Sequence, residues 1–96
     1  MKIGLIGLGK MGMNLAQNLM DHKHEVVAFD LNKEAVKEIT DLGAQGVGTI
    51  ADMVSKLESP RIVWVMVPHG VVDSVLGEIA PLLSENDIVI EAGNSH

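Results

Sequence analysis

The sequence predicts a doubly wound α/β domain, in which helices cover both faces of a parallel sheet. Three observations support this prediction. Apolar segments of strand length alternate with segments of helical periodicity along the chain. The first apolar segment is nearly continuous, which is typical of a strand buried on both faces. That segment breaks into glycines at Gly7, Gly9 and Gly12, directly before a helical pattern.

Composition limits the classes of protein that the chain can represent. Its 96 residues suit one small domain or part of a larger one, and with one Phe, one Trp and no Tyr the core must be aliphatic. A formal net charge of -6 argues against a general nucleic-acid binder. The apolar runs are far shorter than the roughly 20 residues that cross a membrane. No cysteine is present and Met1 leads straight into a strand, so we expect a cytoplasmic protein without a signal peptide.

The first two strand–helix units occupy the first half of the chain. We expect strands over Lys2–Ile6 and Glu25–Phe29, each followed by a helix, from about Met11 to Asp21 and from about Lys33 to Leu42. Apolar residues recur in both helices at the spacing of one helix face. These residues are Gly12, Leu15, Ala16 and Leu19 in the first helix, and Ala35, Val36, Ile39 and Leu42 in the second. Gly43 is well placed to end the second helix.

The second half continues the same alternation. A short third strand is expected near Gly46–Gly48, then a third helix capped by Thr49 and ended before Pro60. The segment Arg61–Val67 is the most hydrophobic run and predicts a central strand. A fourth helix and a strand over Asp87–Glu91 complete the pattern. The inward faces of the last two helices are Ile50, Met53, Val54 and Leu57, and Val72, Val75, Leu76 and Ile79.

Right-handed crossovers give this chain a Rossmann-like sheet with strand order 3-2-1-4-5. The order reverses between strands one and four, and ligands of such sheets bind there, beyond the carboxyl ends of the strands. Four segments meet at that edge: Gly7–Gly12, Asp30–Asn32, Val67–Gly70 and Ala92–His96. We take these segments as the predicted site.

The glycine motif G-x-G-x-x-G predicts a dinucleotide-binding turn between the first strand and the first helix. Gly7 permits the tight turn, Gly9 lets a pyrophosphate approach the backbone, and Gly12 lets the helix pack against the strand. Free backbone N–H groups and the positive end of the helix dipole attract the phosphates. An ordinary glycine turn between two packed elements is the alternative.

Asp30 follows the second strand, 18 residues after Gly12, at the position that meets the adenine ribose in dinucleotide folds. Its carboxylate would accept hydrogen bonds from both ribose hydroxyls and repel a 2′-phosphate, which favours NAD over NADP. Alternatively, Asp30 caps the second helix, and the two roles are compatible. Lys33 keeps NADP open as a cofactor because its ammonium could reach a 2′-phosphate.

Histidines and the end of the chain supply the other candidate groups. His69 is either a general base or, as the loop position favours, a residue that lines the cofactor path. His22, His24 and His96 lack the spacing of metal ligands, so we expect no metal. Asn94 and Ser95 suit a ribose or a polyhydroxy substrate, or form an ordinary turn.

The segment GLIGLGKMGMNLAQNL resembles the N-terminal fingerprint of the β-hydroxyacid dehydrogenases. Within them, the stretch from MVSKLESPRIVWVMVP to IVIEAGNSH is similar to the 6-phosphogluconate dehydrogenase family. The resemblance implies that the cofactor is bound by Gly7, Leu8, Gly9, Lys10, Met11, Gly12, Asp30, Leu31, Asn32, Pro68, His69, Gly70 and Asn94. Asn94 and Ser95 would bind the substrate.

Three departures from the NADP-dependent members bear on the cofactor. Those members commonly have Asn-Arg-Thr where this chain has Asp30-Leu31-Asn32, so the arginine that would pair with a 2′-phosphate is missing. They carry Lys-Ala-Gly in place of Pro68-His69-Gly70, and many have Ala at the position of Gly9. The resemblance therefore implies NAD, with NADP as the alternative.

The implied reaction is oxidation of 6-phosphogluconate by hydride transfer, followed by loss of CO₂ to give ribulose 5-phosphate. In the family a lysine and a glutamate of a later helical domain carry the chemistry, so we expect residues 1–96 to be a truncated NAD(P)-binding domain with no catalytic residue. The expected partners are a sugar-acid phosphate and further copies of the full-length protein in a homo-oligomer. A 3-hydroxyisobutyrate-type dehydrogenase and a non-catalytic nucleotide-sensing module remain as alternatives.

Overall fold

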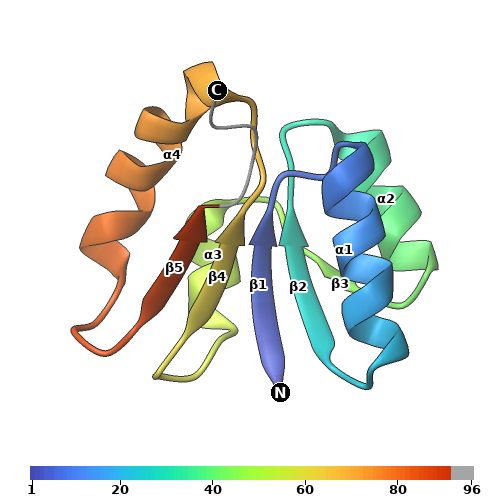
Figure 1. Ribbon diagram of the computed structural model, residues 1–96, viewed down its shortest axis with the longest axis horizontal. Helices are drawn as coiled ribbons and strands as arrows, with labels where there is room; N and C mark the ends of the chain where they lie inside the picture. The colour runs from blue at the N-terminus through green and yellow to red at the C-terminus, as the bar shows by residue number, and fades with distance from the viewer. Residues whose placement is uncertain (92–96) are drawn as a thin grey trace.

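Five parallel strands form the sheet of the computed structural model, which describes residues 1–91. They are β1 (Lys2–Ile6), β2 (Glu25–Phe29), β3 (Gln45–Gly46), β4 (Ile62–Val65) and β5 (Ile88–Glu91). Their order across the sheet is β3-β2-β1-β4-β5 (Figure 1). The predicted order and the reversal between β1 and β4 are therefore confirmed.

Helices cover the sheet in two layers. They are α1 (Lys10–Asp21), α2 (Lys33–Asp41), α3 (Ile50–Ser55) and α4 (Val72–Ile79), with short 3₁₀ turns η1 (His69–Val71) and η2 (Ala80–Leu82). α1 and α2 lie on one face, over β1 and its neighbours toward β3, while α3 and α4 lie on the other (Figure 1). Within residues 1–91, no helix combines the length and apolar character that crossing a membrane requires.

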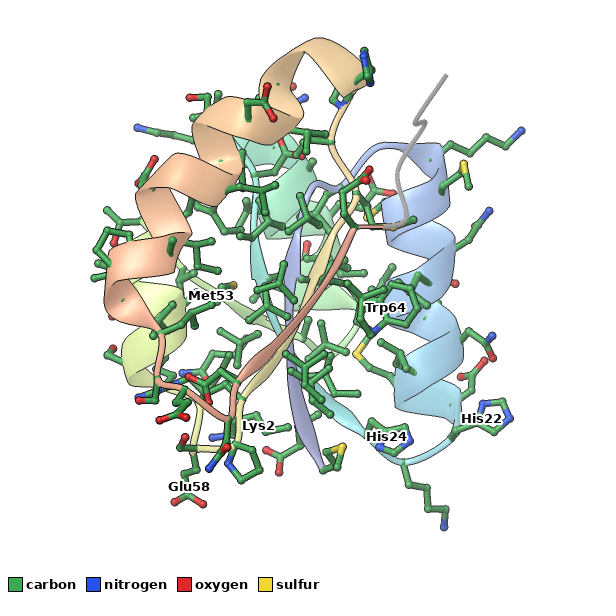
Figure 2. All side chains as sticks on the ribbon, turned by 60° about the vertical axis from the view of Figure 1, so that its left-hand side comes forward. Lys2, His22, His24, Met53, Glu58 and Trp64 are labelled. Carbon is green, nitrogen blue, oxygen red and sulfur yellow. The ribbon has the colours of Figure 1, made fainter. Side chains whose placement is uncertain are left out.

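Two aliphatic clusters fill the space between these layers, as the composition predicts. Because side chains alternate along a strand, Leu5 of β1 packs toward α1 and α2, whereas Ile6 packs toward α3 and α4. Both are fully buried. Figure 2 shows Met53 and Trp64 on opposite sides of the sheet, in these two clusters. β1 is thus buried on both faces, as its continuous apolar run indicates.

The third strand differs from its predicted position. β3 is Gln45–Gly46 rather than Gly46–Gly48, and it pairs with Val27 and Ala28 of β2. A Cβ at Gly46 would meet the side chains of Thr40 and Val36, so this glycine lets α2 pack closely on the sheet. The glycine marks the strand itself, whereas Gly48 already belongs to the turn before α3.

The ends of several elements also differ from the predicted bounds. Leu42, expected on the inner face of the second helix, instead follows the last turn of α2 and is 51% exposed. The reason is the turn at Gly43, whose φ of +122° ends the helix as predicted and directs Leu42 outward. β4 is shorter than Arg61–Val67, because the chain leaves the ladder after the Met66 N–H donates to the Ile6 carbonyl at 2.7 Å.

Candidate functional site

A cleft of about 660 Å³ opens at the carboxyl edge of the sheet, between the ends of β1 and β4. Its walls come from the loop between β1 and α1, the end of β2, the end of β4 and the start of α4. Among its lining residues are many that the sequence predicts: Gly7, Leu8, Gly9, Lys10, Met11, Gly12, Asp30, Leu31, Asn32 and Pro68. The topology therefore brings together segments that lie far apart in the chain.

The three glycines of the loop have different steric surroundings. Gly7 has φ +106°, and a Cβ there would lie 2.5 Å from the Met66 carbonyl oxygen. A Cβ on Gly12 would collide with the Gly7 carbonyl oxygen. A Cβ on Gly9, in contrast, would meet no protein atom within 4 Å. Packing explains Gly7 and Gly12, whereas the absence of a side chain at Gly9 leaves open a space that faces the cleft.

The N-terminus of α1 differs from those of α2 and α3. Asn32 and Thr49 cap α2 and α3 through their side chains, and Glu34 and Asp52 follow in the first turns. In α1 the cap is Gly9, which has no side chain, and its first turn contains no acidic residue. The first backbone N–H groups of α1 and the positive end of its dipole thus have neither a side-chain cap nor an acidic residue in the first turn, which suits a phosphate.

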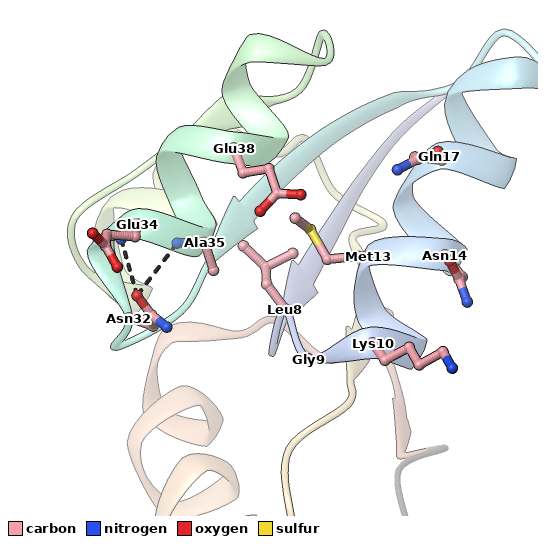
Figure 3. A pocket seen from close by; sticks show the side chains of 10 residues that line it. All are labelled: Leu8, Gly9, Lys10, Met13, Asn14, Gln17, Asn32, Glu34, Ala35 and Glu38. Carbon is pink, nitrogen blue, oxygen red and sulfur yellow. Dashed lines mark hydrogen bonds between the residues drawn. The ribbon is translucent and has the colours of Figure 1, made fainter.

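The Asp30 carboxylate joins two of the loops. Its Oδ2 accepts the Leu8 N–H at 2.5 Å, and its Oδ1 accepts the Asn32 N–H at 2.7 Å. Asn32 in turn accepts the N–H groups of Glu34 and Ala35 at 3.0 and 3.4 Å, which makes Asn32 the cap of α2 (Figure 3). The alternative in which Asp30 caps this helix is therefore wrong, and its carboxylate remains at the edge of the cleft.

The wall opposite the glycine loop is apolar. Leu31 is 84% exposed at the end of β2, and Val71 and Val75 contribute from η1 and α4. Phe29 and Val67 continue this wall toward the sheet. Sequence reasoning does not identify the two valines, because helical periodicity places Val75 in the core and gives Val71 no role. Their i, i+4 spacing at the start of a helix is the signal that could have found them.

Other predicted residues lie away from the cleft wall or outside the described part of the chain. His69 and Gly70 are exposed in η1 and are not among the residues that line the cleft. Asn94 and Ser95 lie outside residues 1–91. Figure 2 shows His22 and His24 in the turn before β2, at the end of the sheet opposite the cleft. No group of three His, Cys, Asp or Glu side chains suited to a metal occurs within the described residues.

A second groove, of about 510 Å³, continues from the cleft between α1 and α2 (Figure 3). It shares Leu8, Gly9 and Lys10 with the cleft, but its other wall carries the carboxylates of Glu34 and Glu38. These two negative charges oppose the single ammonium of Lys10. The groove is therefore less suited to a phosphate than the cleft, where the start of α1 has no acidic neighbour in its first turn.

Comparisons with known proteins agree with this geometry. The family model described as the NAD binding domain of 6-phosphogluconate dehydrogenase matches residues 2–96. The chain is 55% identical over 96 residues to YqeC of Bacillus subtilis, covering 100% of this chain and 32% of that protein. It is 44% identical over 97 residues to the NAD(+)-dependent, decarboxylating 6-phosphogluconate dehydrogenase of Haloferax volcanii, with the same coverage. The chain thus spans about a third of the length of these relatives.

Solved structures show the same fold. Plasmodium falciparum 6-phosphogluconate dehydrogenase, whose structures include a complex with NADP+, aligns with a TM-score of 0.87 and 26% identity over 97% of this chain and 21% of that one. Mycobacterium tuberculosis 3-hydroxyisobutyrate dehydrogenase aligns with a TM-score of 0.86 over 96% of this chain and 31% of that one. At 22% identity, this second similarity concerns the fold alone.

Proposed function

The chain belongs to the 6-phosphogluconate dehydrogenase family as its NAD-binding domain, and from this premise we propose that its cleft holds NAD for the oxidative decarboxylation of 6-phosphogluconate. The observation that carries the proposal is the open space at Gly9, beside the uncapped start of α1. No protein atom lies close enough to Gly9 to exclude a side chain there. A pyrophosphate bound close to the backbone would exclude one.

Each part of the dinucleotide has a matching wall in the cleft. The pyrophosphate lies on the loop of Gly7, Leu8, Gly9, Lys10, Met11 and Gly12, with the backbone N–H groups at the start of α1 as donors. The adenine ring lies between Leu31 and the valines Val71 and Val75, since an aromatic ring suits apolar walls. Pro68, after β4, lines the cleft toward the nicotinamide, and the proposal has His69 and Gly70 approach the cofactor from η1 beside it.

Asp30 supports NAD rather than NADP as the preferred cofactor. Its carboxylate is at the edge of the cleft and would lie next to the 2′ position of the adenine ribose, where a second negative group is repelled. The Haloferax volcanii relative is named as an NAD(+)-dependent enzyme. Lys33 follows at the start of α2, and its ammonium is the feature that keeps NADP as the alternative cofactor.

In the whole protein, the bound dinucleotide accepts a hydride from 6-phosphogluconate, and loss of CO₂ gives ribulose 5-phosphate. This chain binds and orients the cofactor, and Asn94 and Ser95 contact the substrate. The catalytic lysine and glutamate of the family have no counterpart in these 96 residues, so we expect NAD binding without turnover. We also expect the full-length protein to be a homo-oligomer.

Calorimetric titration of the chain with NAD and with NADP tests the proposal. We expect NAD to bind more tightly, because a 2′-phosphate would approach Asp30. Asp30→Asn, which removes the charge and keeps the shape, should narrow the difference between the two affinities. Equal affinities in the unmodified chain would contradict the assignment of Asp30, and the lack of binding of either dinucleotide would overturn the proposal itself.

The alternatives differ from this proposal in ways that can be measured. The 3-hydroxyisobutyrate dehydrogenase structure is 22% identical to this chain and supports the fold alone, whereas decarboxylating 6-phosphogluconate dehydrogenases are 37–44% identical over almost the whole chain. A nucleotide-sensing module would bind NAD but give no reduced cofactor. Reduction of NAD by the full-length protein with 6-phosphogluconate, accompanied by release of CO₂, is the result expected here.

A further inference from the structure

The Asp30 carboxylate forms a hydrogen bond whose consequence reaches beyond the ribose. Its Oδ2 accepts the N–H of Leu8, the residue between the first two glycines of the loop, at 2.5 Å and across 22 positions of sequence. Its Oδ1 accepts the N–H of Asn32 at 2.7 Å. A single side chain therefore connects the loop that follows β1 with the turn that follows β2.

This bond continues the pairing of β1 and β2 beyond the sheet. The N–H of Gly7 donates to the Phe29 carbonyl at 2.9 Å, which is the last backbone bond of this ladder. At Gly7 the chain turns with φ +106°, so the next N–H, that of Leu8, has moved past the end of β2. The Asp30 carboxylate accepts the Leu8 N–H and so takes the place of the backbone carbonyl that a continued β2 strand would have supplied.

Leu8 is held at both its ends. Its side chain is 4% exposed and packs with Leu5, Ala16 and Ala28 under α1. The bond from the Leu8 N–H to Asp30 is part-buried, and an N–H that loses a carboxylate acceptor loses a charge-assisted hydrogen bond. Without Asp30, the segment that includes Leu8 and Gly9 loses the side chain that fixes this N–H, and that segment lines the cleft.

We propose that Asp30 is a positioning residue for the pyrophosphate loop as well as the residue that selects the ribose, an inference that rests on the function proposed above. The two roles are compatible, since each carboxylate oxygen has two lone pairs and uses one for a backbone N–H. Asp30 thus sets the affinity for a part of the cofactor that it does not touch.

The proposal and a purely electrostatic role for Asp30 predict opposite changes in the affinity for the pyrophosphate when the carboxylate is removed. If Asp30 acted only through its charge, neutral variants would bind the pyrophosphate more tightly, because a repulsive carboxylate is gone. If Asp30 positions the loop, a variant that cannot accept the Leu8 N–H binds the pyrophosphate less tightly. Asp30→Ala and Asp30→Asn remove the same charge, but only Asn keeps an oxygen that can accept this N–H.

The experiment compares adenosine with ADP, because the two ligands differ only in the pyrophosphate. The dissociation constant of adenosine divided by that of ADP measures how much the pyrophosphate strengthens binding. We expect Asp30→Ala to lower this ratio about two- to tenfold relative to Asp30→Asn, which corresponds to the loss of one neutral hydrogen bond. Leu31→Ala, a change on the adenine side of the cleft, should weaken both ligands and leave the ratio unchanged.

Amide hydrogen exchange supplies a second measurement that needs no ligand. In the unmodified chain the Leu8 N–H should exchange slowly, and Asp30→Ala should speed its exchange while the neighbouring Gly7 N–H, bonded to Phe29, keeps its rate. If Asp30→Ala fails to fold, the exchange rate of the Leu8 N–H is measured in the unmodified chain and compared with its rate in Asp30→Asn instead. A Leu8 N–H that is unprotected in the unmodified chain overturns the proposal.

The outcomes distinguish the two proposals. If ADP binds the unmodified chain no more tightly than adenosine does, the cleft is not a dinucleotide site and the proposed function fails. If ADP binds more tightly but Asp30→Ala has a ratio equal to or above that of Asp30→Asn, dinucleotide binding stands and the positioning role of Asp30 is wrong.

Discussion

At the scale of single residues, the site depends on where a side chain is absent. Gly7 and Gly12 are required by the fold, because a Cβ on either would collide with a backbone carbonyl oxygen. Gly9 is not, since its surroundings are empty within 4 Å and its φ of -67° is accessible to any residue. Stability and cofactor binding can therefore be separated by substitutions within one loop.

We predict that Gly9→Val weakens NAD binding at least about tenfold, since its side chain occupies the space of the pyrophosphate. The fold should lose at most about 1 kcal/mol, the typical effect of changing a helix cap. Calorimetry and thermal unfolding measure the two effects. Gly77→Val is the matched control, because its Cβ also meets no atom within 4 Å but projects from α4 outside the cleft lining. A variant Gly9→Val with unchanged NAD affinity would contradict the assignment of the loop.

We predict, in contrast to Gly9→Val, a loss of stability for Gly12→Ala. Its Cβ would run into the Gly7 carbonyl oxygen, so α1 has to shift away from β1. We expect a loss of about 1–3 kcal/mol of unfolding free energy, the usual cost of overpacking a buried site. Chemical denaturation measures this change. A fully stable Gly12→Ala would show that the contact between α1 and β1 is looser than the structure has it.

At the scale of elements, the alternation of strands and helices and the order of the sheet follow from local patterns in the sequence. The spacing of apolar residues predicts the helices, and handedness then limits the topology to a few possibilities. The predicted bounds are wrong where a contact with a residue distant in sequence determines the structure. Gly46 belongs to β3 because α2 packs on it, and no local pattern near Gly46 carries that information.

The same distinction holds for the site. The glycine motif and Asp30 could be found from spacing, because both follow strand ends that topology brings together. The bond between Asp30 and Leu8 spans 22 positions and depends on the parallel register of β1 and β2 and on the turn at Gly7. Val75 was missed as a cleft residue because it serves both the core and the cleft, whereas periodicity alone assigns one face of α4 to one role.

The amino ends of β4 and β5 are joined by a buried carboxylate. Asp87, whose side chain has no exposed surface, accepts the Arg61 N–H at 2.6 Å, the Ser84 N–H at 2.7 Å and the Ser59 hydroxyl at 2.8 Å. The Arg61 guanidinium adds an ion pair at 2.9 Å. The backbone bond from Arg61, followed by that from Ser84, holds the pKa of Asp87 well below its ordinary value.

Because folding lowers this pKa, Asp87 stabilises the fold at pH values above about 4, the range in which an unfolded Asp is ionised. The contribution is lost as the pH falls through the lower pKa of the folded state. We predict that the unmodified chain loses stability between pH 5 and pH 2, whereas Asp87→Asn is less stable at pH 7 and loses less over the same acid range. Urea unfolding at several pH values measures this. Parallel pH profiles of the two proteins would contradict the role of Asp87.

At the scale of the whole molecule, the two faces of the sheet are covered unequally within residues 1–91. α1 and α2 lie over the β1–β3 half of their face, so β4 and β5 have no helix over them there (Figure 1). Register and alternation put Ile62, Trp64, Ile88 and Ile90 on this open face. Ile88 is 51% exposed. In the described residues β5 also pairs on one side only, with β4.

An open apolar face beside an unpaired strand edge favours association between copies of the chain. We therefore predict a monomer–oligomer equilibrium that shifts toward oligomer as concentration rises, measured by sedimentation velocity. Ile88→Lys should shift the equilibrium toward monomer, since a charged side chain opposes burial of this face. Leu42→Lys is matched in exposure, also 51%, but lies beyond α2 and should have no such effect. NAD affinity should stay unchanged in both variants, because neither residue lines the cleft. A chain that stays monomeric at all concentrations would contradict the predicted role of this open face in association.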